Sequence, residues 1–422
     1  MPARQLPRIP VLLQTAGAYG TLAAVRALGR AAVPVIVADP SRFAPARWSK
    51  YTARRLTCPS VNRVDVYLRW LVAFGAAHPG TALCPTNDEL AWLFARHLPD
   101  LRQNFRVAAP PPETLLELLD KRRLQEACAR AGLPTMASWF PGTEKELERL
   151  APELEFPVVV KPRTQLFHRT RFKGGVAADV RSLRVLWRRL SGNGCTEPGL
   201  RRVEPGIADP FVQTYAPVAG EGVLSLSGFV DRTGEVFVVR AARKVVLRPF
   251  VLDVGVWFET ASVDPALAAL LRDLCRQTGY FGVFEAEFVR WKGVQRLIDF
   301  NPRFYGEMGF DQAQGLPLAE LSYLTALGED DAARELARES NGQKAVGPFV
   351  HRFALRFEKK AALNRALPQG PASALSNGAA LDFAKDRDDP LPALLDAVNI
   401  LAGYLRHPRS ALRLLRPAAE AP

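Results

Sequence analysis

The chain has 422 residues, of which 48% are hydrophobic and 23% are charged. This composition supplies enough apolar side chains for two or three domains with buried cores, and it excludes a disordered or fibrous chain. The formal net charge of +13 is compatible with a nucleic acid, an anionic membrane surface or a small anionic substrate as partner. Because no nucleic-acid-binding motif and no run of Lys and Arg is present, we expect no nucleic-acid partner.

The cysteines and the apolar segments indicate the compartment. The cysteines are widely scattered and odd in number, which fits neither a disulfide framework nor a metal site. They are Cys58, Cys84, Cys128, Cys195 and Cys275. No apolar run reaches the ~18 residues of a membrane-spanning helix, and the start of the chain, "MPARQLPRIPVLLQT", lacks the features of a secretory signal. We therefore expect a cytoplasmic protein without a transmembrane segment.

Residues 9–40 have the pattern strand, glycine turn, helix, strand, which predicts the start of a parallel α/β sheet. Asp39 follows the second strand at the distance expected of a ribose-binding acid in a dinucleotide fold. The turn, however, contains only Gly17 and Gly20, whereas the dinucleotide fingerprint has three glycines. Two interpretations remain: a nicotinamide site, or a plain βαβ packing unit, which the missing glycine favours.

The α/β pattern continues through residues 81–101, and a proline-rich linker then suggests a domain boundary near residue 110. Beyond it, "FPVVVKPR" and "PFVQTYAPV" read as strands, and residues 221–246 as a hairpin that turns at 231–234. Two further strands, "FGVFEAEFVR" and "VQRLIDFN", flank "WKG". From residue 326 onward the chain is mostly helical and polar, and it closes with a basic amphipathic stretch at 391–417.

Two of these strands carry polar side chains on one face each. Because alternate residues of a strand point to opposite faces, Glu285 and Glu287 share a face, and so do Asp299 and Asn301. If residues 291–293 form a three-residue loop, Glu287 pairs with Leu297, Glu285 pairs with Asp299, and all four polar groups lie on one surface. A two-residue Lys-Gly turn would shift the register by one residue and separate them.

Such a cluster predicts a bound cation. Three carboxylates repel one another unless they share a cation, and Mg²⁺ prefers carboxylates together with substrate phosphates. Arg303, two residues beyond Asn301, could bind a phosphoryl group or a carboxylate in a bidentate manner. The alternative is a solvated polar face on an edge hairpin. Lys161 favours the interpretation as a binding site, because an ammonium group at the end of an apolar strand is costly unless it contacts an anion.

The order of these features resembles the ATP-grasp superfamily. A lysine opens the domain (Lys121), a lysine ends a strand (Lys161), a hinge follows ("FVQTYAPV"), and two acidic strands close the series ("FEAEFVR" and "IDFNPRFYG"). More narrowly, residues 9–325 resemble the carboxylate–amine ligases related to the large subunit of carbamoyl-phosphate synthase, and "ALCPTNDEL" and "DDPLPALL" are similar to that subgroup.

The resemblance implies a fold that combines α/β and α+β architecture. An N-terminal Rossmann-like pre-ATP-grasp domain would span residues 1–112, and a two-lobed ATP-grasp domain would span 113–325. Within the second domain, the lid and hinge lobe would cover about 125–215 and the metal-binding core about 216–325. A helical C-terminal segment would cover 326–422.

The resemblance also implies roles for individual residues. Lys121 and Lys161 would bind the phosphates of ATP, and Arg303 would stabilise an acyl phosphate and its tetrahedral successor. One or two Mg²⁺ ions, with Mn²⁺ as a substitute, would bind Glu287, Asp299 and Asn301. Gln213 and the backbone of Tyr215 and Ala216 would bind adenine, and Glu221 would bind the ribose.

The segment 163–175 departs from the family pattern, because only Gly174 and Gly175 offer the close backbone approach of a glycine-rich phosphate lid. We expect it to be the lid nonetheless. The side chains that would clamp ATP, or recruit an anionic substrate, are Arg169, Arg171 and Lys173. His168 is either a general base or an ordinary surface histidine.

Three further residues have open roles. Glu307 stands where the family has a small residue, and its carboxylate would recognise an incoming amine. Arg243, which we assign as catalytic with Arg303, and its neighbour Lys244 either face the phosphates or the acyl substrate, or are exposed residues of a hairpin.

The function that the resemblance implies is an ATP-dependent carboxylate–amine ligase, which forms an amide through an acyl phosphate and releases ADP and phosphate. The alternatives are a biotin-carboxylase-like enzyme that activates bicarbonate, and a non-catalytic nucleotide-binding protein. The amphipathic stretch 391–417, with Arg406, Arg409, Arg413 and Arg416, either packs on the body of the protein or makes weak contact with an anionic membrane. The substrates stay unidentified, and a homodimer is the default assembly.

Overall fold

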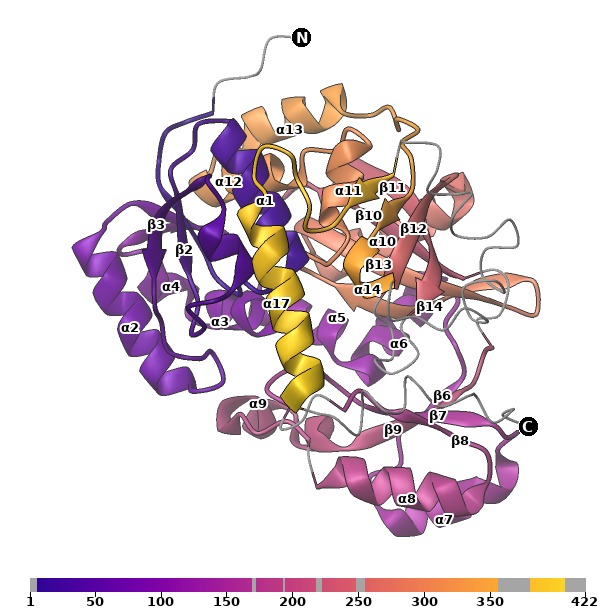
Figure 1. The fold of residues 1–422 in the computed structure, drawn as a ribbon. Helices are drawn as coiled ribbons and strands as arrows, with labels where there is room; N and C mark the ends of the chain where they lie inside the picture. Colours follow the sequence, from indigo (N-terminus) through magenta and orange to yellow (C-terminus); the bar gives the residue numbers. More distant parts are fainter. Residues whose placement is uncertain are drawn as a thin grey trace.

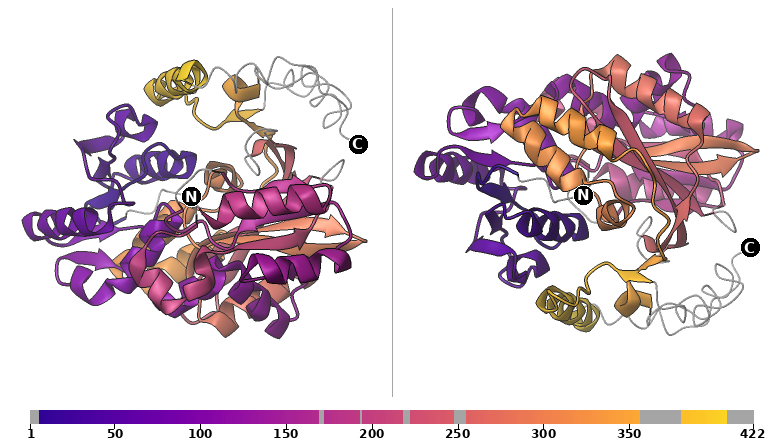
Figure 2. Two further views of the ribbon diagram at one scale, coloured as in Figure 1. Left: turned by 90° about the horizontal axis from the view of Figure 1, so that it is seen from below. Right: turned by 90° about the horizontal axis from the view of Figure 1, so that it is seen from above.

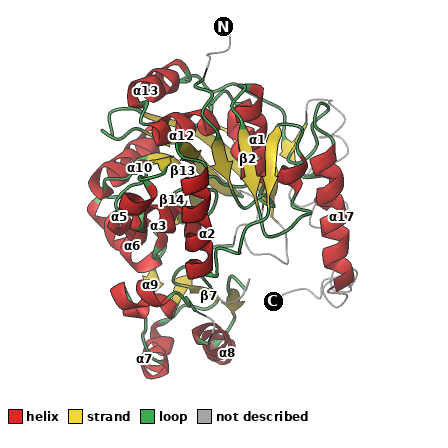
Figure 3. Cartoon of the chain, turned by 90° about the vertical axis from the view of Figure 1, so that its left-hand side faces the viewer, coloured by secondary structure: helices red, strands yellow, loops and turns green. Residues whose placement is uncertain are grey.

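The computed structural model describes residues 6–168, 172–192, 194–217, 222–247, 255–355 and 380–406. It contains three sheets (Figure 1). A parallel sheet lies in the N-terminal domain, a seven-stranded sheet forms the centre, and a four-stranded sheet lies in a separate lobe with helices α7 and α8 (Figure 3). The predicted combination of α/β and α+β architecture is confirmed.

The N-terminal domain is a five-stranded parallel sheet in the order β3-β2-β1-β4-β5. Its first strand, "VLL", is apolar and buried throughout, as expected for a strand covered on both faces. The strands are β1 (Val11–Leu13), β2 (Val35–Ala38), β3 (Thr52–Leu56), β4 (Thr81–Leu83) and β5 (Phe105–Val107). The helices are α1 (Tyr19–Arg30), η1 (Pro45–Trp48), α2 (Val64–Ala77), α3 (Asp88–Arg96) and α4 (Leu98–Leu101).

The central sheet has the order β14-β13-β10-β11-β12-β15-β16 and is antiparallel except at its last pair. Helices α5 (Pro112–Leu119) and α6 (Lys121–Arg130) lead into it, and α10 (Pro265–Thr278) packs against α6. Its long strands are β10 (Val223–Val230), β11 (Phe237–Leu247), β12 (Gly255–Ala261), β13 (Gly282–Trp291) and β14 (Val294–Asn301).

The third sheet has the order β6-β9-β7-β8. Its cluster of buried apolar side chains is separate from that of the central sheet. The lobe contains β6 (Ser138–Trp139), α7 (Glu144–Leu150), η2 (Ala151–Glu153), β7 (Val158–Pro162), β8 (Gly175–Ala177), α8 (Val180–Ser191), α9 (Pro198–Val203), η3 (Pro205–Ala208) and β9 (Pro210–Thr214).

The segment after residue 325 is not only helical, which corrects the prediction. It contains β15 (Phe349–Val350), which pairs with β12, and β16 (Leu381–Asp382), which pairs with β15. Strands of two residues are too short to show an alternating pattern in a sequence. Helices α11 (Met308–Ala313) and α12 (Leu318–Leu327) lead into this segment, and its own helices are α13 (Asp330–Glu339), α14 (Arg352–Leu355) and α17 (Leu391–Arg406).

Helix α17 packs on η1 and lies beside the N-terminal domain in both views of Figure 2. Its apolar side chains at helical spacing face away from that contact: Leu394 is 61% exposed and Leu405 is 82% exposed. The helix therefore packs on the body through its other face, and contact of the apolar stripe with a membrane stays a prediction. Residues 407–417 of the predicted stretch, with Arg409, lie outside the described part of the chain. Within that part, no helix has the length and apolar character needed to cross a membrane.

The glycine turn after β1 is a packing unit. A Cβ atom at Gly20 would lie 2.2 Å from the carbonyl oxygen of Tyr305, so α1 touches the backbone of the loop that follows β14. The Asp39 carboxylate accepts hydrogen bonds from the backbone N–H groups of Ala16 (2.7 Å) and Ser41 (2.8 Å). Since this carboxylate is engaged within its own loops, the geometry favours the packing interpretation over a ribose site.

We expect Gly20→Ala to lower the free energy of unfolding by about 2 kcal/mol or more, because the added methyl group meets a backbone oxygen that cannot rotate away. Gly17→Ala is the matched control, since a Cβ at that position meets no atom within 4 Å. Urea denaturation of both variants measures the difference. Equal stabilities would contradict the close approach of α1 to this loop.

Candidate active site

A cavity of about 340 Å³ lies where the N-terminal domain, the central sheet and the four-stranded lobe meet. It brings together seven of the residues that the sequence predicts for the site. They are Lys121, Lys161, Lys173, Glu287, Asp299, Asn301 and Arg303. These residues are up to 182 positions apart in the chain. They come from the start of α6, from strand β7, from the loop before β8, and from the β13–β14 hairpin and the loop that follows it.

The β13–β14 hairpin has a register that differs from the predicted one. Its turn is the two-residue Lys292-Gly293, with both residues at positive φ (49° and 79°), and Trp291 pairs with Val294. This is the turn that we expected to separate the polar groups. A β-bulge compensates, because Ile298 is an extra residue between the pairs Phe288–Leu297 and Glu287–Asp299.

Beyond the bulge, Glu287 pairs with Asp299 and Glu285 pairs with Asn301. The predicted pairs, Glu287 with Leu297 and Glu285 with Asp299, were therefore wrong. The predicted convergence of the four polar side chains is nevertheless present, and all four line the cavity. The polar groups lie on one surface because the bulge restores the alternation that the short turn displaces.

The carboxylates share a cation, but that cation is a lysine. The ammonium group of Lys244 is ion-paired with Glu285 (2.7 Å), with Glu307 (2.8 Å) and with Glu287. Lys244 is 4% exposed, whereas its neighbour Arg243 is exposed on the other face of β11. Arg243, which the sequence suggests as catalytic, is not among the residues that line the cavity.

Ion pairing keeps Lys244 charged, and burial favours the protonated form of Glu285. Burial favours the neutral amine of Lys244, but the three glutamates outweigh this effect and hold its pKa well above the usual value. Burial and the neighbouring Glu307 raise the pKa of Glu285 to about 8, against the opposing effect of Lys244. The cluster therefore binds more protons at neutral pH than separate glutamates would.

A second group of charges lies beside the first. Lys121 forms an ion pair with Asp299. Although burial favours the protonated acid, Lys121 and then Lys161 and Arg303 hold the pKa of Asp299 below its usual value. The Asp299 carboxylate is therefore ionised at neutral pH, and its side chain is 37% exposed.

Arg303 connects the hairpin to the N-terminal domain. Its guanidinium donates to Asp88 Oδ1 (2.9 Å) and to Asn301 Oδ1 (2.7 Å), and the Asn301 amide donates in turn to Glu285 (3.1 Å). Burial opposes the charge of Arg303, but Asp88 first, and then Glu285 and Asp299, raise its pKa. Asp88 belongs to "PTNDEL", where Asn87 caps helix α3 by accepting a hydrogen bond from the N–H of Leu90 (2.9 Å).

The predicted metal ligands are engaged with cations of the protein. Among the described residues, no three His, Cys, Asp or Glu side chains are arranged to hold a metal ion. Glu287 contacts Lys244, Asp299 contacts Lys121, and the Asn301 amide oxygen accepts from Arg303. Two carboxylates and an amide oxygen on one cavity wall nevertheless fit the donor chemistry of Mg²⁺, once the lysine ammonium groups turn toward an anionic ligand.

The predicted adenine-binding residues do not line the cavity. Gln213 is buried in β9 and donates to Ser138 Oγ (3.1 Å). Tyr215 and Ala216 follow the end of β9, and Ala216 packs against the same buried apolar cluster, Met136, Val223 and Val289, as Ile298, the bulge residue that lines the cavity. Glu221 lies outside the described residues.

The predicted lid is described in part. Lys173 lines the cavity, but Arg169 and Arg171 lie outside the described residues. Gly174 has φ +131° and packs closely, since a Cβ there would lie 2.3 Å from the carbonyl oxygen of Val160. His168 forms a backbone bridge to Cys195 and does not line the cavity.

Several cavity residues were missed by the sequence analysis. They are Tyr19, Asp88, Phe258, His351 and Phe383. None of them stands in the strand-end positions that carry the resemblance. Of these residues, only Asp88 lies in a segment that the sequence analysis singled out, the helix start in "TNDEL".

The chain is similar to known proteins, although no family model matches it. It is 26% identical over 263 residues to the carbamoyl phosphate synthase large chain of Rubrobacter xylanophilus. The aligned region covers 60% of this chain but only 23% of that relative, so the chain spans less than a quarter of the relative's length.

Solved structures resemble the fold over most of the chain. The biotin carboxylase domain of 2-oxoglutarate carboxylase from Hydrogenobacter thermophilus, solved as a dimer with MgADP and bicarbonate, has a TM-score of 0.60 and 17% identity, and covers 80% of this chain and 73% of that one. Biotin carboxylase from Campylobacter jejuni has a TM-score of 0.60 and 16% identity, and the match covers 80% of this chain and 74% of that one. The L-amino acid ligase from Bacillus licheniformis has a TM-score of 0.56 and 13% identity, and the match covers 82% of this chain and 79% of that one. At these identities the likeness concerns the fold alone.

We expect Lys244→Met to lower the free energy of unfolding by about 3–5 kcal/mol, because it leaves three buried glutamates without their cation. Arg243→Met is the matched control, since that neighbour is exposed on the same strand. Chemical denaturation near neutral pH measures both. A Lys244→Met protein as stable as the control would show that the glutamates do not depend on this ammonium.

Proposed function

The chain has the ATP-grasp fold, and from this premise we propose that it is an ATP-dependent ligase that joins a carboxylate to an amine. The proposed reaction forms an acyl phosphate and releases ADP and phosphate. The observation that carries the proposal is that one cavity brings together a lysine at a helix start, a lysine in a strand, three side chains with oxygen donors for a metal ion, and a partly buried arginine. The resemblance assigned these residues to one site from their order in the sequence.

The cationic side of the cavity would bind ATP. Lys121 and Lys161 both lie close enough to Asp299 to lower its pKa, and Lys173 lines the same cavity. Phosphate oxygens would replace the Asp299 carboxylate as partner of Lys121. Adenine would lie near Ile298, which lines the cavity and packs against the same apolar cluster as Ala216 after β9.

Glu287, Asp299 and Asn301 would hold one or two Mg²⁺ ions. When bound, the ion would neutralise charge on the transferring phosphoryl group. Release of Lys121 from Asp299, and of Lys244 from Glu287, frees the two carboxylates for this role.

Arg303 would stabilise the acyl phosphate and the tetrahedral species that follows. Its guanidinium is held in place by Asp88 and by Asn301, so little rearrangement is needed when negative charge develops beside it. A guanidinium stays charged and offers planar, paired donors, which suits a phosphoryl or carboxylate group.

The carboxylate substrate must be activated away from water, because an acyl phosphate hydrolyses. The segment 163–175 would close over the cavity during this step. Glu307, buried beside Lys244, would attract the ammonium form of the incoming amine.

The second candidate is a bicarbonate-activating enzyme, which the likeness to two biotin carboxylases favours. Incorporation of labelled bicarbonate separates the two, since a ligase for other acids incorporates none. A non-catalytic nucleotide-binding protein would bind ATP without any turnover. A cytoplasmic location, and a homodimer like that of the Hydrogenobacter domain, are proposed with the function.

The test is release of ADP and phosphate from Mg-ATP in the presence of amino acids, dipeptides and other small carboxylates, each with and without amines. Release that requires one acid and one amine, with a product lighter by one water than their sum, supports the ligase. Tight ATP binding without release from any pair would count against it.

We expect Lys161→Ala to weaken ATP binding by at least about tenfold, because a charge-assisted contact to a phosphate is lost. Lys145→Ala is the control, since Lys145 is an exposed lysine of the same lobe. Titration calorimetry with ATP measures both affinities. If the two variants bind ATP equally well, Lys161 does not contact the nucleotide.

Asp299→Asn is expected to abolish metal-dependent turnover, because the amide cannot supply the charge that a divalent ion requires. ATP binding in the absence of metal should be kept. Asp331→Asn, whose native side chain is 96% exposed, is the control. Phosphate release as a function of Mg²⁺ concentration measures the effect, and turnover retained by Asp299→Asn would refute the assignment.

A further inference from the structure

Three side chains from distant parts of the chain, two of them buried and one partly buried, form a hydrogen-bonded group at the cavity wall. Tyr19 of α1 and His351 of the β15–α14 connection line the cavity, and Asp396 of α17 lies behind them. The Tyr19 hydroxyl donates to Asp396 Oδ1 (3.0 Å) and lies 2.5 Å from His351 Nε2, which is 3.2 Å from Asp396 Oδ2. His351 is 4% exposed and Asp396 is 6% exposed.

The hydrogen bonds assign the proton of His351. Its Nδ1 accepts from the backbone N–H of Ala354 (3.1 Å), so Nδ1 carries no proton and the proton of the neutral ring is on Nε2. Nε2–H then donates toward Tyr19 and Asp396. Asp396 thus accepts on both oxygens, and Tyr19, which donates to it, also lines the cavity.

The backbone holds this group in a fixed position. The N–H of His351 donates to the carbonyl oxygen of Val256 (2.9 Å), which ties it to β12. The contact of Gly20 with Tyr305 fixes the start of α1 beside the loop that carries Glu307.

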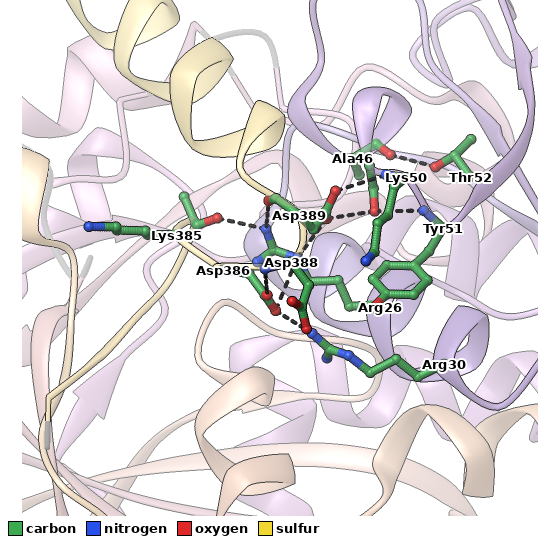
Figure 4. A network of polar contacts seen from close by, with 12 residues as sticks. Arg26, Arg30, Ala46, Lys50, Tyr51, Thr52, Lys385, Asp386, Asp388 and Asp389 are labelled. Atoms are coloured by element: carbon green, nitrogen blue, oxygen red, sulfur yellow. Dashed lines mark hydrogen bonds and ion pairs between the residues drawn. The ribbon is translucent and has the colours of Figure 1, made fainter.

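Helix α17 is fixed by charges that precede it. Figure 4 shows Asp386 and Asp389 between Arg26, Arg30 and the backbone of Lys50. Arg26 Nε lies 2.9 Å from Asp389, whose side chain is 1% exposed. This contact anchors the C-terminal segment to the N-terminal domain, and α17 starts two residues later.

Aromatic rings connect this group to the buried glutamates. Tyr19 packs edge-on against Phe383 (centroids 5.2 Å apart), and Phe383 packs against Phe258 (5.5 Å). The ammonium of Lys244 lies 5.6 Å from the centre of the Phe258 ring. An amine in this half of the cavity would therefore lie on an aromatic wall between two acidic groups, away from the lysines that would bind phosphates.

We propose that Tyr19, positioned by His351 and backed by Asp396, forms the subsite for the nucleophilic amine and receives its proton. This inference rests on the proposed ligase function and adds to it a location for the amine. It also identifies the amine as one that carries an apolar or aromatic body, because Phe258 and Phe383 form the surrounding wall.

The proposed step is balanced within these groups. The lone pair of the amine nitrogen forms the new C–N bond, and the acyl C–O bond to phosphate breaks, with its electron pair leaving on phosphate. The proton lost by the nitrogen passes to the Tyr19 oxygen as the Tyr19 proton passes to Asp396 Oδ1. Tyr19 touches the amine in this step, whereas His351 and Asp396 act through it.

Hydroxylamine allows the two halves of the reaction to be measured separately. It is largely unprotonated at neutral pH and traps an acyl phosphate as a hydroxamate without an enzyme-bound proton acceptor. We expect Tyr19→Phe and Asp396→Asn to form hydroxamate from acid and Mg-ATP within about twofold of the wild-type rate. Their kcat for amide formation with the amine should fall about 100-fold, in the range of general-base effects.

Tyr19→Phe removes one oxygen atom and keeps the ring packed, so it tests the proposal even if Asp396→Asn does not fold. Asn399→Ala is the control, because Asn399 is an exposed residue of the same helix whose side chain donates to the carbonyl oxygen of Phe43 (3.0 Å). It should change neither rate.

Two outcomes would overturn the inference, and they are distinguishable. Normal amide formation by Tyr19→Phe, with hydroxamate formed as in the wild type, overturns the amine subsite alone. Absence of hydroxamate from every acid with the wild-type protein overturns the ligase proposal and this inference with it.

Discussion

The buried ammonium group of Lys244 is the interaction on which the rest of the site depends. It joins strand β11 to Glu285 and Glu287 of β13 and to Glu307 in the loop beyond β14. Burying these glutamates as carboxylate anions without a cation would be costly, because an unpaired charge in a protein interior is unfavourable. The lysine thus fixes three separate segments relative to one another.

The same network crosses the boundary between domains. From Lys244 it passes through Glu285 and Asn301 to Arg303, and Arg303 is bound to Asp88 of helix α3. Each member is held by its neighbours, so a change at one residue alters the hydrogen bonds of the others. The N-terminal domain therefore takes part in positioning the arginine that would stabilise the acyl phosphate.

The C-terminal segment closes the other side of the same cavity. Strands β15 and β16 extend the central sheet, and Asp389 anchors the following helix to Arg26. As a result, Phe383 and His351 reach the cavity wall and Asp396 lies behind it. Variation in this segment would alter the proposed amine end of the cavity while leaving the lysines proposed to bind phosphates unchanged.

The sequence by itself determined the fold class, the parallel N-terminal sheet and the set of residues around the β13–β14 hairpin. These features follow from local patterns: alternation along strands, the glycine turn and the order of lysines and acids. The lysines Lys121 and Lys161 and the strand-end residues Asp299 and Asn301 were predicted in this way, and all of them line the cavity.

Only the tertiary structure decided the pairing register and the partners of the charges. The bulge at Ile298 and the two-residue turn offset each other, which no local pattern reveals. Lys244 and Arg243 are adjacent in the sequence, and only the packing of β11 shows that one is buried among glutamates and the other is exposed. Tyr19, His351 and Asp396 are separated by up to 377 positions, and contacts across such distances depend on how the domains pack, because no local preference of the chain encodes them.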